Sequence, residues 1–219
     1  DFNLQLDDKT KLLTYDGSKG VLKYNWQGAS AGSLGLRGQS ENPQFYVKYT
    51  QSYLPQSLSS AAEAQQRGFV VKRELIRVPE GDAPRTKTPI EQPNKTFTFQ
   101  MGDILEEHIQ VVNPERRHFV AVSAPFAAGF ELLNPNLNIA SADANPTGQT
   151  TDAGDYQAYL DDKVIFYFDE MSAGSYDFYY RLKATTAGDF THPPAEAEKM
   201  YQLEVRGNSH GARMVIEGE

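Results

Sequence analysis

Apolar and polar residues alternate in short runs along much of the chain, and Gly, Pro, Asn or Ser bounds most of these runs. In the segment 43–54, for example, Phe45, Val47 and Tyr49 are spaced two residues apart. A period of two places successive side chains on opposite faces of a β-strand, and turn-forming residues mark its ends. The pattern therefore predicts an all-β chain. The expected strands cover residues 1–7, 20–26, 32–38, 43–54, 68–78, 97–113 with a turn at 101–103, 116–126, 164–170, 175–185, 200–205 and 212–218.

A run of small and polar residues at 57–68 separates two groups of expected strands. It has no firm periodicity, so both a linker and a short helix are compatible with it. We place a domain boundary there, which gives a β-rich domain of residues 1–67 and a C-terminal domain of residues 68–219. Many short strands with few helical patterns predict two β-sandwich-type domains with Greek-key connections. The second is expected to be an antiparallel sandwich with a short helix.

Two faces can be distinguished in the expected strand 104–113, ILEEHIQVVN. Leu105, Ile109 and Val111 share one face with Glu107, while the other face carries more polar residues. Because alternate residues of a strand point to the same side, the mostly apolar face is predicted to lie against the core.

The segment 192–207, HPPAEAEKMYQLEVRG, joins a Pro-Pro pair to an Ala/Glu/Lys run and then to an expected strand. We expect a short helix at residues 195–199, followed by a strand at residues 200–205. Alternation along that strand would place Tyr201 on the apolar, core side and leave Met200 exposed. A functional surface presented to another domain is the alternative role for these two side chains.

Composition excludes several classes of function. A net charge of -8 and a pI near 5.1 argue against a nucleic-acid surface, which needs clustered Lys and Arg. The absence of cysteine excludes disulfides, thiolate metal sites and a Cys nucleophile. No apolar run approaches the roughly 20 residues that a membrane helix needs. The chain begins with Asp-Phe-Asn and has no signal-like segment, so we expect a fragment of a longer protein.

The residues that commonly bind metals do not form a convincing site. None of His108, His118, His192 and His210 has a partner at metal-ligand spacing, so a surface or rim position is predicted for them. His108 and Glu106 are expected to share one strand face, but two ligands do not complete a zinc site. No metal site and no cofactor are therefore expected from these residues.

The loop at 143–155 begins with the pattern D-x-N-x-x-G, which is the start of a calcium-binding loop. Gly154 stands where such a loop needs its bidentate acid. A solvated Asp/Asn turn is the preferred interpretation, and a weak Ca²⁺ site that uses Asp152 and Asp155 stays open.

No catalytic motif is present, and we predict that the chain is not an enzyme. It has no G-x-S-x-G elbow and no Gly-rich phosphate loop, and the adjacent carboxylates Asp161 and Asp162 point in different directions in a turn. A second class of function stays open, a cell-envelope β-sandwich module for adhesion or carbohydrate binding. Trp26, with Tyr24 on the same face of its strand, would then be the sugar platform.

Several motifs in the second half of the chain occur in an order that is typical of one family. They are Gly102-Asp103, Asn113-Pro114, Pro125, Gly129-Phe130-Glu131, Pro193-Pro194-Ala195 and Met200-Tyr201. From Gly68 to the C-terminus, the chain resembles the last macroglobulin-like domain of bacterial alpha-2-macroglobulins. The resemblance implies an immunoglobulin- or fibronectin-like sandwich for residues 68–219. By position alone, residues 1–67 would be a segment of the CUB-like module that flanks the thioester domain.

The resemblance also implies a function. Members of this family are periplasmic protease inhibitors that trap a protease after it cuts a bait segment, often with the help of a reactive thioester. This part of the molecule would be an interdomain scaffold and a lid over the thioester domain. Met200 and Tyr201 would shield the thioester or contact the neighbouring domain, since an apolar thioether and an aromatic ring exclude water from an acyl group.

The implied partners are the neighbouring domains of the same longer chain, above all the thioester domain, and the target proteases of the full-length protein. A peptidoglycan-synthesis partner and attachment to the inner membrane are also compatible with the resemblance. A second bacterial branch lacks the thioester, and this chain does not contain the Cys-x-Glu-Gln motif. Shielding and simple interdomain contact therefore both stay open for Tyr201.

Overall fold

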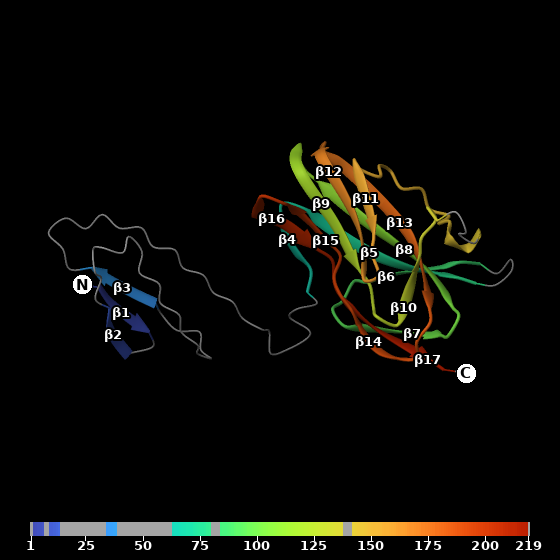
Figure 1. Cartoon of the computed structure of the whole chain (residues 1–219), viewed down its shortest axis with the longest axis horizontal. Helices are drawn as coiled ribbons and strands as arrows, with labels where there is room; N and C mark the ends of the chain where they lie inside the picture. Colours follow the sequence, from blue (N-terminus) through green and yellow to red (C-terminus); the bar gives the residue numbers. More distant parts are fainter. Residues whose placement is uncertain are drawn as a thin grey trace. The chain divides into compact units, whose positions relative to one another are not determined.

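The computed structural model of the chain consists almost entirely of β-strands and turns (Figure 1). It describes residues 2–6, 9–13, 34–38, 63–79, 84–137 and 142–218. The chain divides into two units, Asp1–Tyr53 and Leu54–Glu219. Within the described ranges, no helix is long and apolar enough to cross a membrane. The all-β class that the alternating pattern predicts is confirmed.

The N-terminal unit contains a three-stranded antiparallel sheet. Its strands are β1 (Phe2–Leu6), β2 (Lys9–Leu13) and β3 (Leu34–Gly38), in the order β2-β1-β3. The expected strands that overlap β1 and β3 are confirmed, and β2 was not predicted. The expected strands at 20–26 and 43–54 lie outside the described residues.

The larger unit contains two sheets of five and six strands. The five-stranded sheet has the order β10-β13-β8-β5-β6, and the six-stranded sheet has the order β11-β12-β9-β15-β16-β4. The strands of the first are β5 (Val70–Val78), β6 (Thr86–Pro89), β8 (Ile104–Asn113), β10 (Phe130–Leu133) and β13 (Gly174–Ala184). Those of the second are β4 (Gln65–Arg67), β9 (Arg117–Pro125), β11 (Tyr156–Tyr159), β12 (Lys163–Met171), β15 (Glu196–Lys199) and β16 (Gln202–Asn208).

The apolar core lies between these two sheets. Phe166 of β12 packs against Phe178 of β13 with ring centroids 4.5 Å apart, so aromatic side chains of both sheets interdigitate. Leu105, Ile109 and Val111 of β8 are fully buried, which confirms the face that was predicted to meet the core. The sandwich that the alternating pattern predicts is thus the observed packing.

A third sheet lies at one end of this sandwich (Figure 1). It consists of β14 (Gly188–His192), β17 (Ala212–Glu217) and β7 (Lys95–Gln100), in the order β14-β17-β7. β17 pairs with β7 in parallel, whereas the other strand pairs of this unit are antiparallel in the described ranges. Phe99 of β7 meets Phe130 of β10 edge to face at 5.4 Å, which joins this sheet to the five-stranded one.

The segment 195–199 is the main correction to the predicted elements. A short helix was expected there, but residues Glu196–Lys199 form β15, which lies between β9 and β16. Alanine, glutamate and lysine favour helix in isolation, but two backbone ladders and the burial of Ala197 favour the strand here. The short helix that the structure does describe in this unit is a 3-10 turn at Ala142–Ala144.

The strand β4 lies on the N-terminal side of the boundary that we expected at 67/68. Its residues Gln65–Arg67 pair with Asn208, Gly207 and Arg206 of β16. The larger unit therefore includes residues that precede Gly68, and the assignment of residues 1–67 to a CUB-like segment stays a prediction.

Candidate functional site

A β-hairpin of strands β15 and β16 presents the two residues singled out from the sequence. Lys199 pairs with Gln202, so Met200 and Tyr201 form the two-residue turn between the strands. Met200 is 39% exposed and Tyr201 is 80% exposed. Both side chains are therefore available to a surface outside this unit.

The exposure of Tyr201 corrects the orientation that strand periodicity predicted for it. Alternation was counted from Met200 and placed Tyr201 on the core side. The structure ends one strand at Lys199 and begins the next at Gln202, so neither turn residue belongs to a pleated ladder. Alternation holds only within a strand, and it therefore makes no statement about the turn. The exposure that was predicted for Met200 is confirmed.

Two more exposed apolar residues lie at this end of the sheet. Phe119 of β9 is 49% exposed and Leu203 of β16 is 60% exposed. The ring of Phe119 meets the ring of Tyr201 edge to face, with centroids 5.4 Å apart and an interplanar angle of 82°. The main-chain N–H of Met200 donates a hydrogen bond to the carbonyl oxygen of Phe119 at 2.8 Å. We refer to Phe119, Met200, Tyr201 and Leu203 as the hairpin tip.

The hairpin tip concentrates exposed apolar surface. Eight large apolar side chains are exposed in the described part of the chain, and four of them belong to the tip. Isolated exposed apolar residues are common in soluble proteins, whereas a cluster of them marks an interaction surface. The tip is therefore the candidate contact site of this chain.

A buried polar cluster contacts the segment that leads into the hairpin. We refer to its residues Arg73, Glu107, Tyr180 and His192 as the buried anchor. Arg73 Nε donates to Glu107 Oε2 at 2.8 Å, and the Tyr180 hydroxyl donates to the same oxygen at 2.5 Å. The side chains of Arg73 and Glu107 have no solvent exposure. A buried ion pair is tolerated only when its remaining polar atoms also have partners.

The guanidinium of Arg73 provides those partners by reaching two main-chain carbonyls. Its Nη1 donates to the carbonyl oxygen of Pro193 at 2.6 Å, and its Nη2 donates to that of Pro125 at 2.8 Å. Pro125 ends β9 of the six-stranded sheet, and Pro193 lies just before β15. One side chain of β5 therefore ties together the two sheets and the segment that enters the hairpin.

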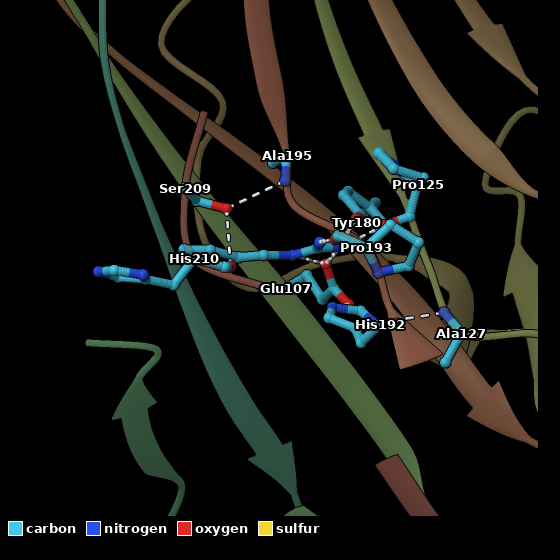
Figure 2. A network of polar contacts seen from close by, with 10 residues as sticks. Glu107, Pro125, Ala127, Tyr180, His192, Pro193, Ala195, Ser209 and His210 are labelled. Atoms are coloured by element: carbon cyan, nitrogen blue, oxygen red, sulfur yellow. Dashed lines mark hydrogen bonds and ion pairs between the residues drawn. The ribbon is translucent and has the colours of Figure 1, made fainter. Parts of the chain in front are cut away.

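His192 completes the buried anchor (Figure 2). Its Nδ1 accepts a hydrogen bond from the main-chain N–H of Ala127 at 3.2 Å, so the ring proton belongs on Nε2. Nε2 lies 3.1 Å from Glu107 Oε1. The alignment of that contact falls short of a well-formed hydrogen bond, and neither atom has another partner among the described residues.

The base of the hairpin is held by a second set of bonds. The main-chain N–H of Ala195 donates to the hydroxyl of Ser209 at 3.0 Å (Figure 2). The main-chain N–H of Ser209 donates to the carbonyl oxygen of Ala195 at 2.8 Å. Ser209 is fully buried. The Pro-Pro-Ala segment is thus fixed at Pro193 by the buried anchor and at Ala195 by Ser209.

Burial and charge act in opposite directions on the pKa values of the anchor. Burial is the largest influence on the pKa of Glu107 and raises it, but the positive charge of Arg73 and the contacts with His192 and Tyr180 together outweigh burial and lower that pKa to about 2. Burial and the charge of Arg73 lower the pKa of His192 below its ordinary value of 6.5. The native anchor therefore contains an ionised Glu107 and a neutral His192 at pH 7.

We expect acid to destabilise the chain in two steps. An unfolded chain protonates His192 near pH 6.5 while the native chain does not, so stability falls as the pH drops below that value. Glu107 adds a second loss between pH 4.5 and about 2, because the unfolded chain protonates it first. The second step is worth roughly 3 kcal/mol when a pKa difference of 2.5 is converted. Urea unfolding midpoints between pH 8 and pH 2 measure both steps.

The variant His192→Gln separates the first step from the second. Glutamine does not titrate, so the decline between pH 6.5 and pH 5 should disappear while the loss below pH 4.5 persists. A decline of unchanged size between pH 6.5 and pH 5 in this variant would show that another group causes it.

Three of the four histidines have clearly different environments. His192 is fully buried, so the surface or rim position predicted for it is wrong. His108 is 11% exposed, with Nδ1 2.9 Å from Glu74 Oε2 and Nε2 2.7 Å from Asp177 Oδ1. His118 is exposed at the surface, as predicted. Sequence spacing did not reveal these neighbours because they lie on other strands.

Glu106 and His108 do not act together. Glu106 Oε2 accepts hydrogen bonds from the main-chain N–H of Thr147 and from Arg181 Nε, both at 2.9 Å. Its Oε1 accepts the N–H of Gly148 at 3.1 Å. Glu106 thus holds the loop that resembles a calcium-binding loop against the five-stranded sheet.

Two carboxylates of that loop accept main-chain hydrogen bonds. Asp152 Oδ1 accepts the main-chain N–H of Gly154 at 2.9 Å, and Asp155 Oδ2 accepts that of Asp169 at 2.7 Å. No group of three or more His, Asp or Glu side chains suited to a metal ion occurs in the described ranges. The bond of Asp152 agrees with the turn interpretation, whereas the bond of Asp155 links the loop to β12. Trp26 and Tyr24, the candidate sugar platform, lie outside the described residues.

Sequence reasoning did not find the buried anchor, although one signal was present. Glu107 stands on an apolar face between Leu105 and Ile109, and a charged residue at such a position indicates a buried partner. The partners themselves come from three other strands and from positions 34 to 85 residues away, so spacing along the chain could not identify them.

Comparison with known proteins now assigns the family. The model of the bacterial alpha-2-macroglobulin MG10 domain matches residues 68–204. Among curated proteins, an alpha-2-macroglobulin homolog of Nostoc is 23% identical over 152 residues, which cover 68% of this chain and 8% of that protein.

Solved structures show the same fold. The native conformation of the Escherichia coli alpha-2-macroglobulin superposes with a TM-score of 0.56 at 19% identity, over 75% of this chain and 10% of that one. The Salmonella alpha-2-macroglobulin that has reacted with methylamine gives a TM-score of 0.52 at 19% identity, over 72% of this chain and 10% of that one. The chain thus spans about a tenth of these relatives.

The larger unit is a macroglobulin-like β-sandwich of the MG10 class. The chain belongs to the bacterial alpha-2-macroglobulin family. This assignment rests on the match to more than half of the chain, and it confirms the family that the ordered motifs of the sequence resemble.

Proposed function

We propose that this chain is the C-terminal part of a longer periplasmic protease inhibitor that traps proteases. Its body from residue 68 would be an interdomain scaffold and a lid over the thioester domain of the same chain, with no catalytic step of its own. Family membership supports the inhibitor class. The observation that carries the role of a lid is the hairpin tip, where Tyr201 and Met200 are exposed at the turn between β15 and β16.

The chemistry of the tip fits the contact that we propose. A thioester is an acyl group that water hydrolyses, so its protection requires apolar groups that fill the space around it. Met200 supplies a flexible thioether and Tyr201 supplies a large ring with one polar atom at its edge. The buried anchor and Ser209 fix the base of the hairpin, which keeps the two side chains pointed outward.

We refer to the longer protein of which this chain would be a part as the full-length parent. We expect the substitution Tyr201→Gly to increase the reactivity of the thioester in it. The rate of methylamine incorporation should rise about tenfold or more, because burying an aromatic ring contributes roughly 1.5–3 kcal/mol. The matched control is Tyr156→Gly, since Tyr156 is also exposed, at 65%, but lies on β11 away from the tip. Equal rates in the parent and in the Tyr201→Gly variant would contradict the lid role.

Amide hydrogen exchange tests the contact between the hairpin tip and the neighbouring domain, whether or not the full-length parent contains a thioester. Amides of residues 199–203 should exchange more slowly in the uncleaved parent than in this chain alone, because a docked surface excludes water. Cleavage of the bait by a protease should remove that difference. The same exchange rate in both forms would show that the tip has no partner domain.

Two further expectations belong to the parent as a whole. Periplasmic location predicts that the parent is released by osmotic shock, or is found with the inner membrane if it is anchored there. A peptidoglycan-synthesis partner would be found by cross-linking in cells, and its absence would leave the inhibitor proposal intact.

A further inference from the structure

Phe119 has a backbone conformation that is unusual for its residue type. Its φ is +56°, in the left-handed region, although it lies within strand β9. A bulky residue is a true outlier there, because its Cβ crowds the neighbouring carbonyl. Asn94 is the other non-glycine residue with positive φ in the described part of the chain, and asparagine tolerates that region.

The strained residue makes two contacts with the turn that carries the proposed function. Its carbonyl oxygen accepts the N–H of Met200, and its ring packs edge to face against Tyr201. The ladder between β9 and β15 ends at the pair Val120 and Lys199, so Phe119 lies where the hairpin leaves the sheet. Strain of this kind persists where the surrounding structure enforces it, and it often occurs at functional sites.

The opposite side of the turn is irregular as well. Glu198 pairs with Arg206 and Lys199 pairs with Gln202, so three residues of β16, Leu203 to Val205, lie between consecutive pairs. An irregularity of this type bends a strand and redirects its side chains. A regular ladder with β16 therefore does not hold the turn. From the neighbouring strand β9, Phe119 contacts the ring of Tyr201.

We propose that Phe119 is a positioning residue of the hairpin tip, which orients Tyr201 toward the neighbouring domain and adds its own exposed ring to the contact. This inference rests on the proposed lid function. The partner that fits is an apolar surface of the adjoining domain of the same chain, ringed by polar groups. The rim on this side consists of the exposed pair Arg116 and Glu170 and of His118, which lies 3.8 Å from that glutamate.

Three substitutions of Phe119 in the full-length parent distinguish a residue that orients Tyr201 from one that only stabilises the fold. Phe119→Leu keeps an apolar residue of similar strain but removes the ring, so the protection factor of amides 199–203 should fall about tenfold, the loss expected for a buried aromatic contact. Phe119→Tyr keeps the ring and should retain the parental protection. Phe119→Gly removes both ring and strain, and it should lose protection while its melting temperature stays equal to that of the parent or rises.

The double variant Phe119→Leu/Tyr201→Gly tests whether the two residues act as one unit. If Phe119 acts by orienting Tyr201, the double variant should lose little more protection than Tyr201→Gly alone. Additive losses would show an independent contact and would contradict the positioning role.

The outcomes separate this inference from the function on which it rests. If Tyr201→Gly leaves protection unchanged, the lid function itself fails. If Tyr201→Gly removes protection while Phe119→Leu does not, the lid function stands and the role of Phe119 is wrong. A Phe119→Gly variant that melts well below the parent would likewise indicate a purely structural residue.

Discussion

The substitution Arg73→Leu is expected to destabilise the larger unit by roughly 3–5 kcal/mol, because it leaves Glu107 buried, ionised and without its main partner. The same change also leaves the carbonyls of Pro125 and Pro193 without their donor. For a unit of this size, that loss lowers the melting temperature by about 6–20 °C. Thermal unfolding followed by circular dichroism at pH 7 measures it.

A surface pair provides the control for this experiment. Arg213 and Asp189 form an ion pair in which both side chains are about half exposed, at 56% and 45%. Arg213→Leu should therefore change the melting temperature far less than Arg73→Leu does, because solvent screens an exposed ion pair. If Arg73→Leu were no more damaging than Arg213→Leu, the buried pair would contribute nothing beyond a surface contact.

Removing both charges of the anchor should be less damaging than removing one. In Arg73→Leu/Glu107→Leu, no uncompensated charge stays in the core, so stability should recover in part. Recovery will be incomplete because Tyr180 and His192 lose the carboxylate that they face. A double variant that is less stable than Arg73→Leu would mean that Glu107 stabilises the fold even without its arginine.

The second large effect is expected at Gly207 of β16. A Cβ atom added there would lie 2.2 Å from the carbonyl oxygen of Phe69 and 2.8 Å from its carbonyl carbon. These are main-chain atoms next to β5, so they cannot move aside as the end of a side chain can. Gly207→Ala should therefore destabilise the unit by about 3 kcal/mol or more, toward the upper end for overpacked sites.

Gly174→Ala is the matched control for the glycine experiment. Gly174 also lies in a strand, but an added Cβ would meet only the ring of Tyr176, at 3.7 Å, which is ordinary contact. We expect a change within about 0.5 kcal/mol for this variant. Because Gly207 lies in the strand that supports the hairpin tip, Gly207→Ala should also speed exchange at residues 199–203. Equal stability of the two alanine variants would contradict the close approach of β16 to Phe69.

Both large effects depend on contacts between residues that are far apart in the sequence, and sequence patterns do not reveal such contacts. Arg73 and Glu107 lie on strands that are separated by a loop and by β6 and β7, and Gly207 approaches a residue 138 positions earlier. The alternating pattern reports which side of a strand is buried. It does not report which strand lies opposite, and the energy of a charge or of a close contact depends on that neighbour.

Most strands could be predicted because their signal is local. Continuous β-propensity and bounding turn residues located the strands that became β5, β9, β12, β13 and β17, and Met101-Gly102-Asp103 is the turn between β7 and β8. Segments with weak local preference were missed or misassigned. The short edge strands β6 and β11 are not among the expected strands, and a helix is predicted where β15 lies, because pairing with neighbours decides such segments.

The sequence by itself determined the all-β class, the core face of β8, the absence of thiol chemistry and, through its ordered motifs, the family. Only the tertiary structure decided that Met200 and Tyr201 form an exposed turn, that Phe119 contacts both of them, and that Glu107 shares a buried cluster with Arg73 and His192. Periodicity and composition are local properties, so the order of the residues alone reveals them. Exposure of a turn and ionisation of a buried carboxylate depend on the strands that fold against them, and long-range pairing alone sets these.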